Sequence, residues 1–139
     1  MQTRTLGCCL FPNLHSIHWD TQSWESLPFL RFLFNPELVD VCIEFPSNGS
    51  HIYSPATISM IPTGALTHLV LKSMRSDPLS MDALCNLLDE ASETLKVVHL
   101  DADLSVAVVE KLIQLPNLRQ LRARCAGKMP NITCIVCCV

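Results

Sequence analysis

Hydrophobic residues follow one pattern five times along this chain. A leucine is followed three residues later by an aliphatic residue, and another apolar residue comes two positions after that. The copies are Leu14-x-x-Ile17-x-Trp19, Leu38-x-x-Val41-x-Ile43, Leu66-x-x-Leu69-x-Leu71, Leu95-x-x-Val98-x-Leu100 and Leu118-x-x-Leu121-x-Ala123. Their first leucines lie 24, 28, 29 and 23 residues apart. Each copy predicts a short strand with one buried face.

The first two connections between these motifs predict only short helices. Residues 23–33 carry apolar residues at helical spacing, but Pro28 lies among them and cannot donate a backbone N–H. We therefore expect a short helix that begins near Pro28. Residues 45–64 are rich in turn residues, and there Ser54 looks like a helix cap before Pro55. This pair predicts about one helical turn through Ile61.

The next two connections predict longer helices. Ser80 is expected to cap the first of them, and Asp103 or Ser105 the second, which Pro116 ends. The apolar face of the first is predicted from Leu84, Leu87, Leu88 and Ala91. The apolar face of the second is predicted from Val108, Val109, Leu112 and Ile113. Their spacing by three and four residues predicts that these side chains point inward.

The alternation of strands and helices predicts the fold class. Its period matches that of leucine-rich repeats, which is about 20–29 residues. We therefore predict an α/β fold that is a right-handed β-α superhelix, an irregular leucine-rich-repeat solenoid of about five repeats. Regular repeats place an Asn or Cys eight residues after the first leucine. Those positions are here Gln22, Pro46, Met74, Asp103 and Ala126, which excludes such a side-chain ladder.

The repeats divide the chain into three parts. Residues 1–9 are a lead-in, residues 10–127 the leucine-rich-repeat domain, and residues 128–139 an apolar tail that contains cysteines. A solenoid needs polar capping repeats, because an uncovered last repeat exposes its core. Neither end has this character, so we expect a solenoid truncated at one or both ends. The tail cysteines are expected to be exposed or unfolded.

Composition limits the class and the compartment. Hydrophobic residues make up 49% and charged residues 17%, which predicts a globular protein, and the net charge of −3 argues against a nucleic-acid partner. No apolar run reaches the roughly 18 residues that span a bilayer. The first residues lack the apolar core of an export signal. We therefore expect a cytoplasmic or nuclear protein, with its eight cysteines mostly as thiols.

The side chains that alternate with the buried ones should line a concave sheet face. Candidate partner-binding residues there are His18, Asp20, Glu44, His68, Lys72, His99, Asp101, Arg122 and Arg124. The outer column of this face is expected to run Asp20, Glu44, Lys72, Asp101 and Arg124. Acidic groups gather on the first two repeats and basic groups on the last, an order that can orient a polar peptide. The alternative is a solvated sheet face without a partner.

No catalytic, metal-binding or cofactor-binding residue is predicted. The chain lacks a nucleophile elbow, a phosphate loop and a His-Glu-x-x-His helix. His18 and His99 share a column but should lie roughly 14 Å apart, too far to share a metal. Cys134-x-x-Cys137 has the spacing of zinc and redox sites, but no second pair stands nearby. A cysteine-based metal or redox protein is the less favoured alternative.

Three phrases carry a likeness to a known family. They are Leu10-Phe11-Pro12-Asn13-Leu14 with Trp19-Asp20, Ala65-Leu66-Thr67-His68-Leu69, and Leu115-Pro116-Asn117-Leu118-Arg119-Gln120-Leu121. Through them, residues 10–127 resemble the leucine-rich region of fungal F-box proteins. The resemblance implies that the repeats hold a protein substrate for a cullin-type ubiquitin ligase, whose adaptor docks on an N-terminal F-box. No Leu-Pro-x-Glu-like F-box opening precedes Leu10, so an adaptor is expected as partner only if an F-box lies upstream. Otherwise the chain would be a stand-alone scaffold.

Overall fold

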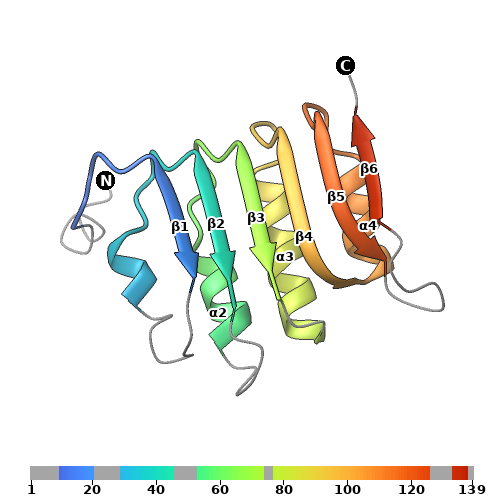
Figure 1. Cartoon of the computed structure of the whole chain (residues 1–139), viewed down its shortest axis with the longest axis horizontal. Helices are drawn as coiled ribbons and strands as arrows, with labels where there is room; N and C mark the ends of the chain where they lie inside the picture. The colour runs from blue at the N-terminus through green and yellow to red at the C-terminus, as the bar shows by residue number, and fades with distance from the viewer. Residues whose placement is uncertain (1–9, 21–28, 46–52, 74–76, 126–132, 138–139) are drawn as a thin grey trace.

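A computed structural model describes residues 10–20, 29–45, 53–73, 77–125 and 133–137. One six-stranded sheet runs through them, with the helices on one of its faces (Figure 1). The strands are β1 (Ser16–Asp20), β2 (Asp40–Glu44), β3 (His68–Lys72), β4 (Val97–Leu104), β5 (Gln120–Cys125) and β6 (Thr133–Cys137). The helices are α2 (Tyr53–Met60), α3 (Pro78–Glu90) and α4 (Val106–Ile113). The strands lie in chain order and β1 to β5 are parallel, which confirms the α/β class and the alternation of strands and helices.

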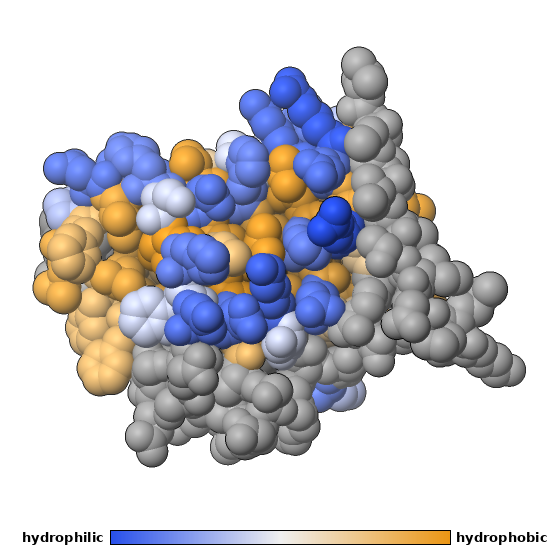
Figure 2. All heavy atoms as spheres, viewed as in Figure 1, coloured by the Kyte–Doolittle hydropathy of each residue, from blue (hydrophilic) through white to orange (hydrophobic). Residues whose placement is uncertain are grey.

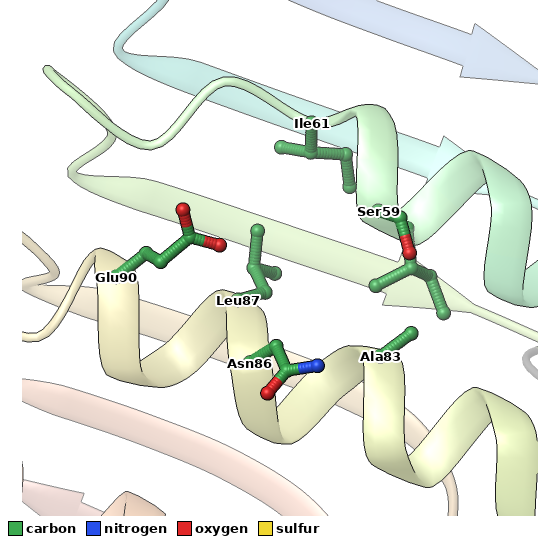
Figure 3. Close-up of a pocket in the computed structure, with 7 residues that line it drawn as sticks. Ser59, Ile61, Ala83, Asn86, Leu87 and Glu90 are labelled. Atoms are coloured by element: carbon green, nitrogen blue, oxygen red, sulfur yellow. The ribbon is translucent and has the colours of Figure 1, made fainter.

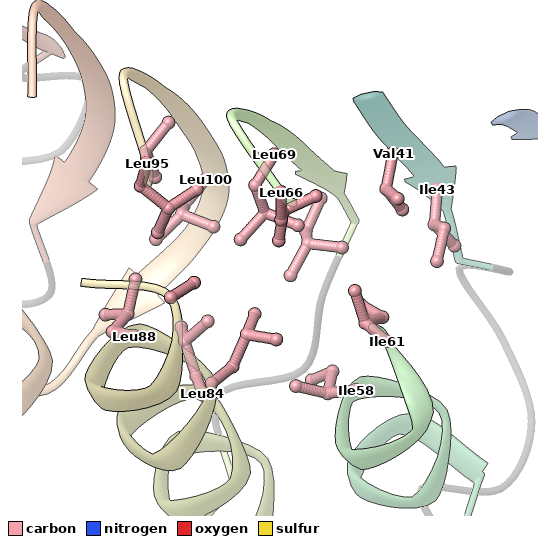
Figure 4. Close-up of a cluster of buried hydrophobic side chains, with 14 of the residues drawn as sticks. Val41, Ile43, Ile58, Ile61, Leu66, Leu69, Leu84, Leu88, Leu95 and Leu100 are labelled. Carbon is pink, nitrogen blue, oxygen red and sulfur yellow. The ribbon is translucent and has the colours of Figure 1, made fainter. Parts of the chain in front are cut away.

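The core lies between the sheet and the helices. Every residue of the five motifs is buried there except Leu14, Trp19 and Leu118, which are partly buried and pack against it. Side chains of β2, β3 and β4 point toward helical residues such as Ile58 and Leu84 (Figure 4). Full burial of one such side chain contributes about 1.5–3 kcal/mol. The repeated motif thus supplies the main source of stability.

A repeated backbone contact sets the strands in register. The carbonyl just after the first leucine of a motif accepts hydrogen bonds from two consecutive N–H groups of the next motif, at 2.7–3.2 Å. The accepting residues are His15, Val39, Thr67 and Lys96. The donating pairs are Val39 and Asp40, Thr67 and His68, Lys96 and Val97, and Arg119 and Gln120. Neighbouring motifs are thus aligned by backbone groups, without a side-chain ladder.

Helix α3 starts at a different cap from the one predicted. Asp77, not Ser80, is the N-cap, and its carboxylate accepts a hydrogen bond from the Ser80 backbone N–H at 3.2 Å. The Ser80 hydroxyl is buried inside the first turn and donates to the same carboxylate at 2.8 Å. Pro78 follows Asp77 as the first helical residue, where its missing N–H is not needed. The predicted apolar face is confirmed, since all four of its residues are buried.

In α4 the cap is Ser105, whose hydroxyl accepts from the Val108 N–H at 3.4 Å. The alternative cap, Asp103, lies inside β4. The predicted inward face is confirmed for Val108 and Leu112, and Val109 is partly buried. It is wrong for Ile113, which is 70% exposed because the helix turns it away from the sheet. No helix in the described residues is long and apolar enough to cross a bilayer.

The two short connections are helical in part. Helix α2 begins at Tyr53 and ends at Met60, so the prediction of Ser54 as its cap is wrong. Of residues 23–33, the structure describes 29–33, and residues 29–32 form a 3-10 turn just after Pro28, where a short helix is predicted to begin. Leu30, at the start of that turn, is fully buried. Both connections therefore place apolar residues against the core, as their spacing predicts.

Part of the predicted tail belongs to the sheet. Strand β6 pairs antiparallel with β5, with Cys134 opposite Ala123 and Cys137 opposite Gln120. The expectation of an unfolded tail is therefore wrong for residues 133–137. The reason is that β5 presents its second edge to this segment, and backbone hydrogen bonds along that edge order it.

Candidate functional site

The sheet face opposite the helices carries the predicted partner-binding residues. We call it the open face, made by the side chains that alternate with the core residues. Its first row is Ser16, Asp40, His68, Val97 and Gln120. Its middle row is His18, Cys42, Val70, His99 and Arg122. Its third row starts with Asp20, Glu44 and Lys72. Parallel pairing thus brings residues from distant parts of the chain into straight rows.

The predicted residues differ in exposure on this face. Those that are exposed are His18, Asp20, His68 and Arg122, and those that are half-buried are Glu44, Lys72, His99 and Asp101. Arg124 lies on β5, and only its backbone position is described. Hydrophilic residues gather over the strands in Figure 2, with hydrophobic ones between them. A partner would therefore meet a mixed polar and apolar surface.

A register shift in β4 changes the third row. The pairing of β4 with β5 shifts between Leu100 and Asp103, so Asp103 lies opposite Arg124. The prediction that Asp101 shares a row with Arg124 is therefore wrong. The physical reason is a bulge, which adds residues to one strand of a pair. The backbone position opposite Arg124 in the third row is therefore that of Asp103 and not that of Asp101.

The β1–β2 half of the open face is acidic. Its third-row carboxylates are Asp20 and Glu44, its first row adds Asp40, and neither strand contains Lys or Arg. Burial raises the pKa of the half-buried Cys42 thiol, Lys72 opposes this shift, and the three carboxylates add to it. Cys42 is thus held as a thiol at neutral pH, and a thiol is a poor nucleophile and metal ligand.

The β3–β5 half carries the cations. Burial lowers the pKa of His99, and the positive charges of Arg122 and Lys72 lower it further, while Asp101 acts in the opposite direction. His99 is therefore a neutral imidazole at pH 7, able both to donate and to accept a hydrogen bond. The fixed positive charge around His99 comes from Lys72 and Arg122.

The lowered pKa of His99 predicts a pH-dependent stability. As pH falls, the unfolded chain binds the proton first, near the ordinary histidine pKa of about 6.5, and the native state is destabilised. The contribution of the neutral imidazole is therefore full above that pKa and is lost as pH falls through the folded-state value. Between about pH 7.5 and pH 5.5, the wild type should lose more unfolding free energy than His99→Gln, measured by urea denaturation. Equal losses in both proteins would contradict the lowered pKa.

The described residues of the open face are not grouped as a metal site. No three His, Cys, Asp or Glu side chains among them are grouped to hold a metal ion. His18 and His99 are separated in their row by Cys42 and Val70, which sets them roughly 14 Å apart.

Apart from the open face, the surface has a groove among the helices, which the sequence patterns did not indicate. This α2–α3 groove has a volume of about 160 Å³ and is lined by Ile58, Ser59, Ile61, Ala83, Asn86, Leu87 and Glu90. In Figure 3, Leu87 and Glu90 reach from α3 toward the end of α2. The groove depends on the side-chain sizes of two facing helices. The one sequence signal is Glu90 in the last turn of α3, where an acidic residue is unfavourable.

Comparisons of the chain with family models, with curated proteins and with solved structures found no match.

Proposed function

We propose that this chain is a right-handed leucine-rich-repeat solenoid whose open face binds a protein partner. The main observation that supports this proposal is the alignment of polar side chains in straight rows over five parallel strands. These rows lie on the face that the helices leave uncovered. A sheet face without a role needs only to be solvated. Here it combines an acidic half, half-buried apolar residues and a cationic half, which gives a partner both area and charge to recognise.

The resemblance to F-box proteins suggests the biological setting. In that setting the open face would hold the substrate of a cullin-type ubiquitin ligase in the cytoplasm or nucleus, and an F-box upstream would bind the adaptor. A stand-alone scaffold module is the alternative, with the same face and no ubiquitin link. An adaptor pull-down with the product of the full transcript separates the two. Capture of the adaptor supports the ligase role, and no capture supports the scaffold.

The binding surface itself can be tested with peptides. Peptides selected from a random displayed library against the chain should map to the open face by protection of β2 to β4 amides from hydrogen exchange. The matched comparison is the protection of α4 amides, which lie on the other side of the sheet. Protection confined to the helices would contradict the proposal.

Charge reversal at the β5 end should weaken acidic binders. Arg122→Glu combined with Arg124→Glu replaces two positive charges with negative ones, and should lower the affinity for acidic peptides by about tenfold or more at low salt. Folding should be intact, since Arg122 is exposed. Lys111→Glu is the control, because Lys111 lies on α4 in an exposed ion pair. Unchanged affinity in the double variant, measured by fluorescence anisotropy, would exclude this end as the contact.

A further inference from the structure

The helix layer carries a negative charge that it does not neutralise at the α2–α3 groove. Neither α2 nor α3 has a basic residue in its last turn, and α3 instead has Glu90 there. The carboxyl end of a helix already carries about half a negative charge. Among the described residues of the three helices, Lys111 is the single cation, and it pairs with Asp89 at 2.8 Å. The negative charge at the groove would therefore favour the binding of a cation from another molecule.

The shape of the groove selects the kind of cation. Its floor consists of the buried side chains Ile58, Ile61, Ala83 and Leu87. A volume of about 160 Å³ suits one side chain, whereas pockets for drug-sized molecules measure about 300–1,000 Å³. The methylene stems of lysine and arginine lie well on apolar surfaces while their charged ends stay in polar surroundings.

The rim of the groove offers oxygen acceptors. Within the described residues, the side chains of Glu90 and Asn86 form no hydrogen bond or ion pair, and both residues are exposed. The hydroxyl of Ser59 donates to the Pro55 carbonyl at 2.9 Å, so its oxygen can still accept. In Figure 3 this hydroxyl points toward α3. A carboxylate, an amide oxygen and a hydroxyl oxygen match the several N–H donors of an ammonium or guanidinium group.

From this arrangement we infer that the α2–α3 groove is a docking site for a lysine or arginine side chain of a partner protein. The stem of that side chain lies on Ile61 and Leu87, and its charged end meets Glu90. The groove lies on the helix side of the sheet and the open face on the other side, so the groove serves a second contact, independent of the one proposed above. A partner that bound both the open face and the α2–α3 groove would contact the protein on both sides of the sheet.

The test uses the whole chain and short alanine peptides with one central residue: arginine, lysine or the uncharged norleucine. NMR signals of the Ile58 and Ile61 methyl groups are followed as each peptide is added. The arginine and lysine peptides should shift these signals saturably, and the norleucine peptide should not. Glu90→Gln should weaken the binding by about fivefold or more, since it removes the charge-assisted hydrogen bond.

The control is Glu110→Gln, the same chemical change at an exposed glutamate on α4, and it should leave the binding unchanged. Adding salt should weaken binding to the wild type, because the rim is exposed to solvent. Absence of saturable shifts, equal shifts with norleucine, or equal affinity in Glu90→Gln would each overturn the inference. Methyl signals from Leu69 and Val98 report that the variants remain folded, since both residues lie in the core.

Discussion

Leu69→Asp is expected to unfold the protein. Leu69 is the second residue of β3, none of it is exposed, and its strand lies between β2 and β4. The substitution removes a buried side chain, which costs about 2–5 kcal/mol. It also places a carboxylate among apolar neighbours, which costs several kcal/mol more whether it is charged or protonated. The free energy of unfolding of a whole domain is only about 5–15 kcal/mol, so these two costs are enough to unfold it.

The measurement is urea denaturation followed by circular dichroism. The wild type should show a cooperative transition, and Leu69→Asp none, or one moved to very low urea. His68→Asp is the matched control, because His68 is the preceding residue of the same strand and is exposed on the open face. Its unfolding free energy should stay within about 1 kcal/mol of the wild type. Similar effects at both positions would mean that the two faces of β3 are assigned wrongly.

The strands could be predicted because burial leaves a local mark on the sequence. In β3, Leu69 and Leu71 alternate with His68, Val70 and Lys72, and this alternation directly gives the two faces. The open face follows from the same alternation. For that reason the predicted residues of the middle row lie where the sequence places them.

The register shift between β4 and β5, by contrast, has no signal in the sequence of β4. Val98, Leu100, Ala102 and Leu104 are all buried and continue one regular alternation through the point where the register shifts. The shift is a property of β4 and β5 together, so it could not be seen in either strand alone. It moves Asp103 to the backbone position opposite Arg124.

The start of α3 was missed for a different reason. Aspartate and serine both cap helices, and Asp77 and Ser80 stand three residues apart. Pro78 was the deciding signal, because proline is favoured at the first helical position. Strand β6 was missed because its apolar run lacks the leucine motif and depends on the free edge of β5. The α2–α3 groove needs the contact between two helices and has no local pattern.

A second large loss of stability is expected at Asn35, a buried polar residue that the repeated pattern does not mark. Its side chain is only 3% exposed and lies between the segment leading into β1 and the one leading into β2. Its amide nitrogen donates to the Phe11 and Leu14 carbonyls at 3.1 and 2.8 Å. Its oxygen accepts from the Glu37 N–H at 2.8 Å. One side chain therefore satisfies three backbone groups.

Asn35→Leu keeps the approximate size of this side chain and removes all three hydrogen bonds. A buried polar group left without a partner costs about 1–3 kcal/mol, so the total loss should be about 3 kcal/mol or more. Hydrogen exchange should also become faster in β1, because the Leu14 carbonyl directly precedes the His15 carbonyl that anchors β2. Urea denaturation measures the first effect and mass spectrometry of exchanged amides the second.

Asn117→Leu is the matched control for this prediction. The Asn117 side chain also donates to a backbone carbonyl of the preceding repeat unit, that of Glu93 at 2.6 Å, but Asn117 is exposed. Water can replace that bond, so the loss should stay below about 1 kcal/mol. If Asn35→Leu lowers the free energy of unfolding no more than Asn117→Leu does, the three hydrogen bonds of the Asn35 side chain do not hold β1 in place. The acidic end of the open face would then depend for its position on the core residues of β1 alone, chiefly Ile17, and not on this polar link.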